Sequence, residues 1–255
     1  MLNLSYMIIG APKCGTGSLY KYVVQHPLVE AASRPDLHFF DDHFDKGLVW
    51  YRQFFPLLNR PPESPAPVGT ITGEVTSFYL FHPLVPERVK QVAPGARFIF
   101  LVRNPTDRAY VHFRDAVDRG LETLSFFQAI KMEAKRLERG RFNLQDNPYA
   151  TWERAKEHSY ISQGLYAEQF RRWLDFFPRE QFLILDAQAF FDAPVETVSE
   201  VYRFLELPEF TPAFVEPPHE NPYAKLTGET RLHIDNFFSR YNEDFYRLAK
   251  KNFGW

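Results

Sequence analysis

The fold is decided by one stretch, Gly10-Ala11-Pro12-Lys13-Cys14-Gly15-Thr16-Gly17-Ser18. A short apolar run from Tyr6 to Ile9 precedes it, and apolar residues recur at helical spacing directly after it. This order predicts a buried strand, a glycine-rich turn and a helix. The N–H groups in the first turn of a helix lack partners and attract anions. The stretch therefore predicts an anion site. The alternative is an ordinary strand-to-helix turn with a surface lysine.

The residue types in this turn suit a phosphate or sulfate group. Gly15 and Gly17 allow the backbone to approach the anion closely, and Thr16 and Ser18 add hydroxyl donors. Lys13 supplies a positive charge. Cys14 is a small packing residue of the loop, and its backbone belongs to the same anion-binding stretch.

A second anion pocket is predicted where the apolar strand 97–102 ends in Arg103. A guanidinium binds a phosphate through two parallel hydrogen bonds, although Arg103 could also pair with Asp107 or a helix terminus. A nucleoside triphosphatase places its lysine directly before the final Ser or Thr and needs a carboxylate for magnesium. Here Lys13 comes early, so we predict no metal. Two anion pockets suit a nucleotide phosphorylated at its 5′ and 3′ positions.

These paired motifs resemble the sulfotransferases that use 3′-phosphoadenosine 5′-phosphosulfate (PAPS). Gly10 to Tyr22 is similar to the 5′-phosphosulfate loop of that family, and Phe98 to Phe113 is similar to its 3′-phosphate motif. Further segments resemble the glycan-modifying branch, typified by heparan sulfate N- and 3-O-sulfotransferases and their bacterial relatives. They are residues 36–41, 47–51, 164–166 and 173–177. The resemblance covers nearly the whole chain.

The resemblance implies a set of roles. Lys13 would neutralise charge on the bridging oxygen of PAPS, residues 14–18 would hold the 5′-phosphate, and Arg103 would bind the 3′-phosphate. The spent nucleotide would be adenosine 3′,5′-bisphosphate. The resemblance also places the catalytic base at Asp36, supported by His38. The alternative is that Asp36 and Asp41 are turn or cap residues and that His38 is a structural histidine.

Three positions depart from the pattern of the family. Asp36 stands where relatives usually have Glu, Gly17 where they commonly have Thr, and Val111 where they usually have Ser. Each departure shortens a side chain or removes a donor. Two other interpretations therefore stay open. One is a protein that binds the nucleotide but has lost catalysis. The other is a P-loop kinase using ATP and magnesium, against which the early lysine and Arg103 argue.

The length and composition of the chain limit the number of domains, the fold class and the kinds of partner. The 255 residues suffice for a single domain, 1–255, and the 17% aromatic residues require a large core. We expect a three-layer α/β/α fold with a mainly parallel central sheet and ligands at the carboxyl ends of its strands. The net charge of −2 gives no general attraction to nucleic acid. We expect a small-molecule or carbohydrate acceptor, and the number of subunits is left open.

The single cysteine excludes an internal disulfide, which is typical of a reducing compartment. No leader pattern and no membrane-spanning apolar run is present in the sequence, so we expect no stable membrane insertion. We predict a cytoplasmic protein, or a soluble domain excised from a larger one.

The rest of the chain reads as alternating strands and helices. Strands are expected at 29–32, 70–74 and 181–185, and helices at 47–55, 86–92, 121–139, 162–177 and 194–205. Glu74 is interpreted equally as an acceptor-cleft residue or a structural carboxylate. Arg136, Arg139 and Arg141 are interpreted as a solvated cluster. Lys225 and Arg231 do not match the family's turn over the 3′-phosphate, so neither is assigned to the nucleotide.

Overall fold

The computed structural model describes residues 2–138, 155–213, 223 and 226–255. These residues fall into two compact units. The first contains Met1–Val102 and Gln169–Glu220, and the second contains Arg103–Glu168 and Asn221–Trp255. The first unit holds the sheet and the second is helical. The expectation of one domain over 1–255 stays a prediction.

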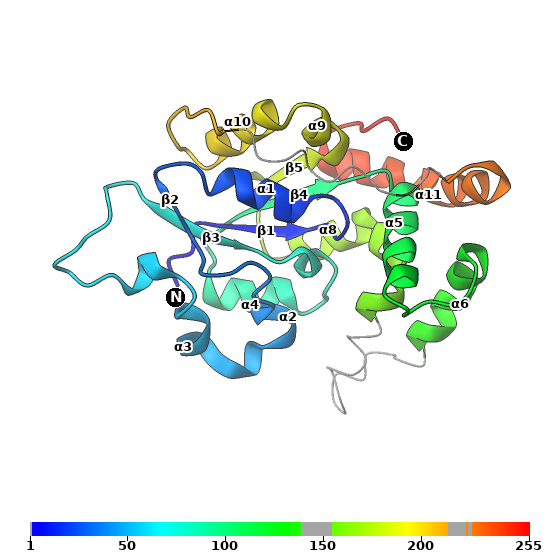
Figure 1. Ribbon diagram of the computed structural model, residues 1–255, viewed down its shortest axis with the longest axis horizontal. Helices are drawn as coiled ribbons and strands as arrows, with labels where there is room; N and C mark the ends of the chain where they lie inside the picture. Colours follow the sequence, from blue (N-terminus) through cyan, green and yellow to red (C-terminus); the bar gives the residue numbers. More distant parts are fainter. Residues whose placement is uncertain (1, 139–154, 214–222, 224–225) are drawn as a thin grey trace. The chain divides into compact units, whose positions relative to one another are not determined.

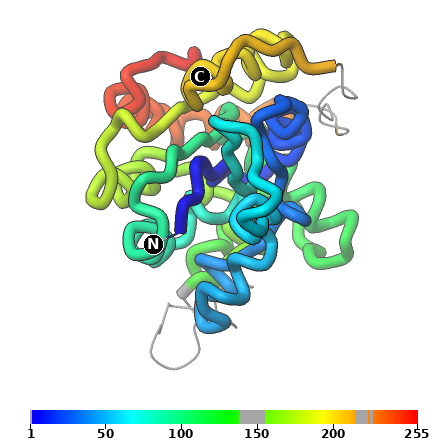
Figure 2. Tube along the Cα trace, turned by 90° about the vertical axis from the view of Figure 1, so that its left-hand side faces the viewer, coloured from blue at the N-terminus to red at the C-terminus, as the bar shows by residue number. Residues whose placement is uncertain are grey.

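Within the described residues, five parallel strands form the sheet of the first unit, in the order β2-β3-β1-β4-β5 (Figure 1). The strand that comes first in the chain lies at the centre, among later segments (Figure 2). All five of its residues are buried. The strands are β1 (Tyr6–Gly10), β2 (Val29–Ala31), β3 (Ile71–Val75), β4 (Arg97–Val102) and β5 (Phe182–Asp186).

Helices cover both faces of this sheet, which confirms the three-layer α/β/α prediction. In Figure 1, α1 (Thr16–Val23), α9 (Ala187–Asp192) and α10 (Pro194–Phe204) lie above the sheet. Below it lie α2 (Phe39–Asp42) and α4 (Val85–Val92). On the lower face, Trp173 from the end of α8 (Tyr166–Leu174) packs on Phe98 of β4, with ring centroids 4.9 Å apart.

Shorter elements join these helices and strands. They are α3 (Gly47–Arg52), which ends before the predicted limit of 55, and four 3-10 turns, η1 (Phe44–Lys46), η2 (Pro56–Asn59), η3 (Ser77–Leu80) and η5 (Arg179–Gln181). The predicted helix 162–177 consists of η4 (Ser162–Gly164) followed by α8. No helix among the described residues is both long and apolar enough to cross a bilayer.

The centre of the sheet requires a glycine in β3. Gly73 pairs with Tyr6 of β1, and a Cβ at position 73 would lie 2.3 Å from the carbonyl oxygen of Tyr6 and 2.5 Å from its ring. Real Cβ atoms do not approach backbone oxygens so closely. The tyrosine ring therefore packs against the bare backbone of its neighbouring strand.

The second unit packs α5 (Pro105–Asp118), α6 (Phe126–Glu138) and α11 (Gly228–Ala249) around an aromatic core. Asn104 caps α5, since its side chain accepts from Thr106 N at 2.9 Å and Asp107 N at 3.3 Å. Helix α6 begins at Phe126, five residues later than predicted. Ser125 and Gln128 explain the start, because their side chains and backbone N–H groups form a reciprocal cap.

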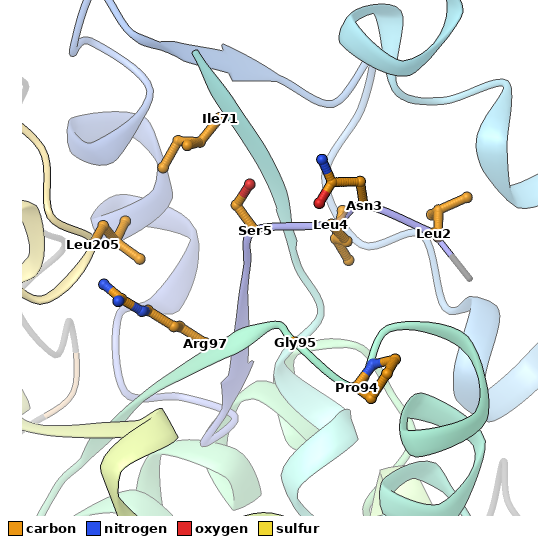
Figure 3. Close-up of a pocket in the computed structure, with 9 residues that line it drawn as sticks. All are labelled: Leu2, Asn3, Leu4, Ser5, Ile71, Pro94, Gly95, Arg97 and Leu205. Atoms are coloured by element: carbon orange, nitrogen blue, oxygen red, sulfur yellow. The ribbon is translucent and has the colours of Figure 1, made fainter. Parts of the chain in front are cut away.

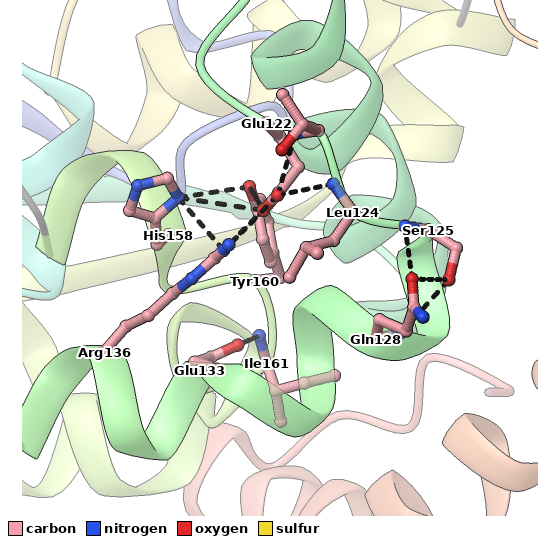
Figure 4. A network of polar contacts seen from close by, with 10 residues as sticks. Glu122, Leu124, Ser125, Gln128, Glu133, Arg136, His158, Tyr160 and Ile161 are labelled. Carbon is pink, nitrogen blue, oxygen red and sulfur yellow. Dashed lines mark hydrogen bonds and ion pairs between the residues drawn. The ribbon is translucent and has the colours of Figure 1, made fainter.

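Arg136 of α6 is part of a polar network and is not the solvated residue we predicted (Figure 4). It donates to both carboxylate oxygens of Glu122, which also accepts from the Tyr160 hydroxyl at 3.0 Å. Burial raises the pKa of Glu122, but hydrogen bonds from Arg136, Leu124 N and Tyr160 outweigh it and bring that pKa to about 2. Arg139 and Arg141 lie outside the described residues, as does Lys225.

Candidate active site

The predicted anion loop connects β1 to α1. Ala11 N donates to Leu101 O of β4 at 2.8 Å, which ties the start of the loop to the sheet. The first intrahelical bond of α1 runs from Leu19 N to Gly15 O at 2.9 Å. The N–H groups of residues 15 to 18 therefore have no acceptor within the helix. The first turn also contains no acidic residue that would repel an anion.

The shape of the loop depends on Gly15. This residue has φ 88°, and a Cβ there would lie 2.8 Å from Cε1 of Phe191. Lys13 has φ 68° and is also left-handed, an unusual conformation for a residue with a side chain. Gly17 differs from both, because its backbone is helical and a Cβ would meet no atom within 4 Å. Position 17 therefore has room for the hydroxyl that the family commonly carries.

Cys14 is a packing residue, as predicted. Its side chain is fully buried, and its Sγ lies 3.7 Å from the carbonyl oxygen of Pro12. Thr16 is buried at the start of α1, while Ser18 is partly exposed.

A second turn leaves the same edge of the sheet. It follows β2 and contains Asp36 and His38, which both have left-handed backbones, with φ 49° and 51°. Asp36 N donates to Val75 O at the end of β3, and Thr76 N just beyond β3 donates to Ile8 O of β1. The turn follows β2 and the anion loop follows β1, with β3 between these two strands, so both segments lie at the carboxyl edge of the sheet. Ligands of parallel sheets bind at that edge.

His38 forms a pair with Asp41. Its Nδ1 lies 2.8 Å from Oδ2 of Asp41, whose side chain is fully buried, and 3.5 Å from Oδ2 of Asp42. A carboxylate accepts only, so a neutral His38 carries its proton on Nδ1 and presents Nε2 as an acceptor. In the interpretation of the sequence, Asp41 appeared only in the alternative, as a turn or cap residue, and this pair was not identified.

Asp36 lies in surroundings that favour its protonated form. Although Asp36 is exposed, partial desolvation by the surrounding protein raises the pKa of its carboxyl, while His38 lowers it and the Asp41 carboxylate raises it again. The net direction is upward. A carboxylate with a raised pKa binds a proton more readily than one in water, which suits a general base.

Glu74 of β3 lies in the interior behind this turn. Its carboxylate accepts from the hydroxyls of Tyr51, Thr76 (2.8 Å) and Tyr79 (3.3 Å). Burial raises the pKa of Glu74 to about 7, although hydrogen bonds from Tyr51 and Thr76 oppose the shift. Of the two interpretations of Glu74, a structural carboxylate agrees with this enclosure.

Ligand atoms of His38, Asp41 and Asp42 lie within 4.8 Å of one another. The hydrogen bond between His38 and Asp41 accounts for part of this closeness. The expectation that the protein uses no metal stays a prediction.

Arg103 directly follows β4 in the chain, and its carbonyl oxygen accepts from the Tyr166 hydroxyl at 3.0 Å. Asp107, the suggested alternative partner of Arg103, is paired with Arg231, with Nη1 2.6 Å from Oδ1. Arg231 also contacts Asp235 at 2.6 Å. The charge of Arg231 is therefore balanced by two carboxylates, which agrees with leaving it out of the nucleotide site.

A separate hollow of about 440 Å³ lies at the opposite edge of the sheet (Figure 3). Its walls come from the amino ends of the strands, including Ser5, Ile71 and Arg97. Arg97 is already engaged there, because its guanidinium donates to Phe204 O and to Glu206. None of the predicted site residues lines this hollow.

Comparison with known proteins relates the whole chain to sulfotransferases. A family model described as "Sulfotransferase domain" matches residues 5–221. The heparan sulfate glucosamine 3-O-sulfotransferase 6 of Mus musculus is 27% identical over 98% of this chain and 72% of its own length. The bifunctional heparan sulfate N-deacetylase/N-sulfotransferase 3 of the same species is 29% identical over 88% of this chain but only 24% of its own length.

A solved structure agrees. The sulfotransferase from Alicyclobacillus acidocaldarius superposes with a TM-score of 0.75 and 26% sequence identity, covering 98% of this chain and 97% of that one. The resemblance stated from the sequence is thereby confirmed at the level of both family and fold.

Proposed function

Since the chain belongs to the sulfotransferase family, we propose that it transfers a sulfuryl group from PAPS to a hydroxyl or amine of a glycan or small-molecule acceptor. The observation that carries this proposal is the juxtaposition of two turns. The anion loop with Lys13 follows β1 and the turn with Asp36 and His38 follows β2, and both leave the carboxyl edge of the parallel sheet, on either side of β3. One turn suits the donor and the other suits proton removal from the acceptor.

The loop residues fit the phosphosulfate end of PAPS. The N–H groups of residues 15 to 18 lie in a first helical turn that has no acidic side chain, and Gly15 lets the loop pass close to the ring of Phe191. We propose that these groups, with the Thr16 and Ser18 hydroxyls, hold the 5′-phosphate. Arg103 would bind the 3′-phosphate through its guanidinium.

When bound, PAPS supplies the sulfuryl group, and its bridging oxygen departs with adenosine 3′,5′-bisphosphate. Lys13 stabilises the charge that grows on that oxygen, so no metal is required. Asp36 takes the proton from the attacking hydroxyl or amine. His38, tied through Nδ1 to Asp41, presents Nε2 to the same acceptor as a second hydrogen-bonding group.

The acceptor class is supported by the relatives. Two of them are named for heparan sulfate, one as a glucosamine 3-O-sulfotransferase and the other as an N-deacetylase/N-sulfotransferase. We propose a glycan acceptor on this ground, with a small hydroxylated or amino compound as the second class to test. A cytoplasmic location stays a prediction.

Calorimetry tests the donor half of the proposal. Adenosine 3′,5′-bisphosphate should bind without any metal, and Arg103→Ala should weaken that binding by about tenfold or more, since one charged bidentate contact is lost. The exposed Arg119→Ala serves as the matched control. ATP binding that requires magnesium would instead indicate a kinase.

Transfer of labelled sulfate from PAPS to a panel of glycans, amines and alcohols tests the acceptor half. Product formation that depends on Lys13 supports the enzyme. Tight bisphosphate binding with no product on any acceptor indicates a nucleotide-binding protein that has lost catalysis, the alternative raised by Gly17, Asp36 and Val111.

A further inference from the structure

A single tyrosine hydroxyl connects the buried Glu74 carboxylate to the turn that carries His38. Tyr79 lies in η3 and is fully buried. Its oxygen accepts from Phe39 N at 2.9 Å and from Phe40 N at 3.3 Å, and it donates to Glu74 Oε1 at 3.3 Å. A hydroxyl has one proton and two lone pairs, so these three contacts use the whole hydrogen-bonding capacity of Tyr79.

These contacts supply the cap that α2 lacks. The helix has four residues, and the side chain of its N-cap residue, His38, makes no capping hydrogen bond. The first N–H groups of a helix have no acceptor inside it. Tyr79 provides one acceptor for the first two of them from a distant part of the chain. Arg88 also holds the helix, through Phe40 O at 2.6 Å and Asp41 O at 3.3 Å. Tyr79, however, fixes its amino end, next to His38.

The backbone of His38 needs such support. Its φ of 51° is unfavourable for a residue with a side chain and persists only where the surroundings impose it. A second link acts alongside Tyr79, because His38 N lies 3.5 Å from Thr76 Oγ1, which donates to Glu74 Oε2 at 2.8 Å. Both links from the turn end on the same carboxylate.

We propose that Tyr79 is a positioning residue for His38. Held by Glu74, its hydroxyl fixes the turn so that the imidazole keeps its hydrogen bond to Asp41 and directs Nε2 toward the acceptor. This inference rests on the proposed transfer function and states what the buried network contributes to it. Burial, with the charges of Glu74 and Asp41, raises the pKa of Tyr79 well above its usual range, so the hydroxyl keeps its proton to donate.

The chain offers a matched pair of variants. Tyr79→Phe removes the hydroxyl that holds α2. Tyr51→Phe also removes a buried donor to Glu74, but the first N–H groups of α2 bond to the Tyr79 hydroxyl and not to that of Tyr51. A phenylalanine at position 51 also keeps the stacking on Phe39, with ring centroids 4.2 Å apart. We expect Tyr79→Phe to lower kcat for sulfate transfer about tenfold or more, with bisphosphate affinity unchanged within about twofold. In Tyr51→Phe, kcat and bisphosphate affinity should both stay within about twofold of the values of the unaltered chain.

A spectroscopic measurement separates this inference from the proposed function. Nitrogen-15 NMR of the His38 imidazole reports which ring nitrogen carries the proton. In the unaltered chain we expect the proton on Nδ1, as the contact with Asp41 requires, and in Tyr79→Phe a mixture of both tautomers. This readout needs no acceptor. If the unaltered chain transfers no sulfate, the proposed function fails while the positioning role is still decided.

Two results would overturn the inference. One is an equal loss of kcat in Tyr79→Phe and Tyr51→Phe, which would show a general packing effect. The other is an unchanged His38 spectrum in Tyr79→Phe. If Tyr79→Phe does not fold, amide hydrogen exchange in the unaltered chain decides. Phe39 and Phe40 N–H should be protected at least about tenfold more than expected for the first turn of a four-residue helix, and exchange at the unprotected rate would refute the role.

Discussion

Nδ1 of His38 lies 2.8 Å from Oδ2 of Asp41, a carboxylate that has no exposed surface. The imidazole itself is about a quarter exposed, so one nitrogen faces the interior and the ring reaches toward solvent. A buried acceptor three residues away in sequence fixes both the tautomer and the orientation of the ring. In the proposed site, this relationship would give the acceptor a defined hydrogen-bonding atom, Nε2.

Asp41→Asn should lower kcat for sulfate transfer by about a hundredfold, because the amide no longer holds the proton on Nδ1. The affinity for adenosine 3′,5′-bisphosphate should stay within about twofold, since the anion loop is separate in sequence. Steady-state kinetics and calorimetry check the two quantities. The exposed Asp45→Asn is the control. A variant with normal kcat would remove Asp41 from the site.

Lys13→Ala should abolish transfer, with kcat reduced by about a thousandfold, because no other residue of the loop carries a positive charge. Labelled sulfate transfer measures the loss. Lys21→Ala, an exposed lysine of α1, should keep full activity. Full activity in Lys13→Ala would refute its catalytic role.

Gly17→Thr should strengthen bisphosphate binding, because a Cβ at position 17 meets no atom of the surrounding protein within 4 Å and the added hydroxyl lies in the first turn of α1. A gain of about threefold to tenfold corresponds to one added neutral hydrogen bond. Gly17→Ala is the matched control, since it adds a side chain without a donor. Equal affinities in the two variants would show that the hydroxyl does not reach the nucleotide.

Glu74→Gln should change how stability depends on pH. The folded-state pKa of Glu74 is raised to about 7 from 4.5, so the folded protein binds the extra proton between these values. The contribution of Glu74 to the free energy of unfolding is fully present below about pH 4.5 and is lost as the pH rises through about 7. The loss amounts to about 3 kcal/mol over that window.

Denaturant unfolding between pH 4.5 and 8 measures how the free energy of unfolding changes with pH. The groups around the carboxylate are Tyr51, Thr76, Tyr79 and Asp41, and the tyrosines do not titrate in this range. The free energy of unfolding should change less with pH in Glu74→Gln than in the unaltered chain. The exposed Glu87→Gln should show the same pH dependence as the unaltered chain. Parallel curves for all three proteins would contradict the raised pKa.

The strand, turn and helix around residues 10–18 were predictable because their signals are local. The apolar run from Tyr6 to Ile9 predicts the strand, and the glycines that follow predict the turn, all within about a dozen residues. The cap at Asn104 was predictable for the same reason. The fold class followed from the alternation of such segments.

The polar network behind the turn was not predictable. Tyr51 and Tyr79 contact Glu74 from elements on either side of it in sequence, and the periodicity of the sequence does not predict such contacts. The late start of α6 was missed because its apolar pattern extends back to Leu121, whereas the reciprocal contact between Ser125 and Gln128 sets the boundary. Arg136 was misread because a charged residue gives no sign in sequence of a distant partner such as Glu122.

The central place of β1 has a consequence during translation. The ribosome releases this strand first, yet its two neighbours begin at Ile71 and Arg97. Until Val102 has left the exit tunnel, the apolar run 6–9 stays incompletely paired, and such unpaired segments favour aggregation and chaperone capture. Nascent chains stalled before that point should be held by chaperones, and longer ones released.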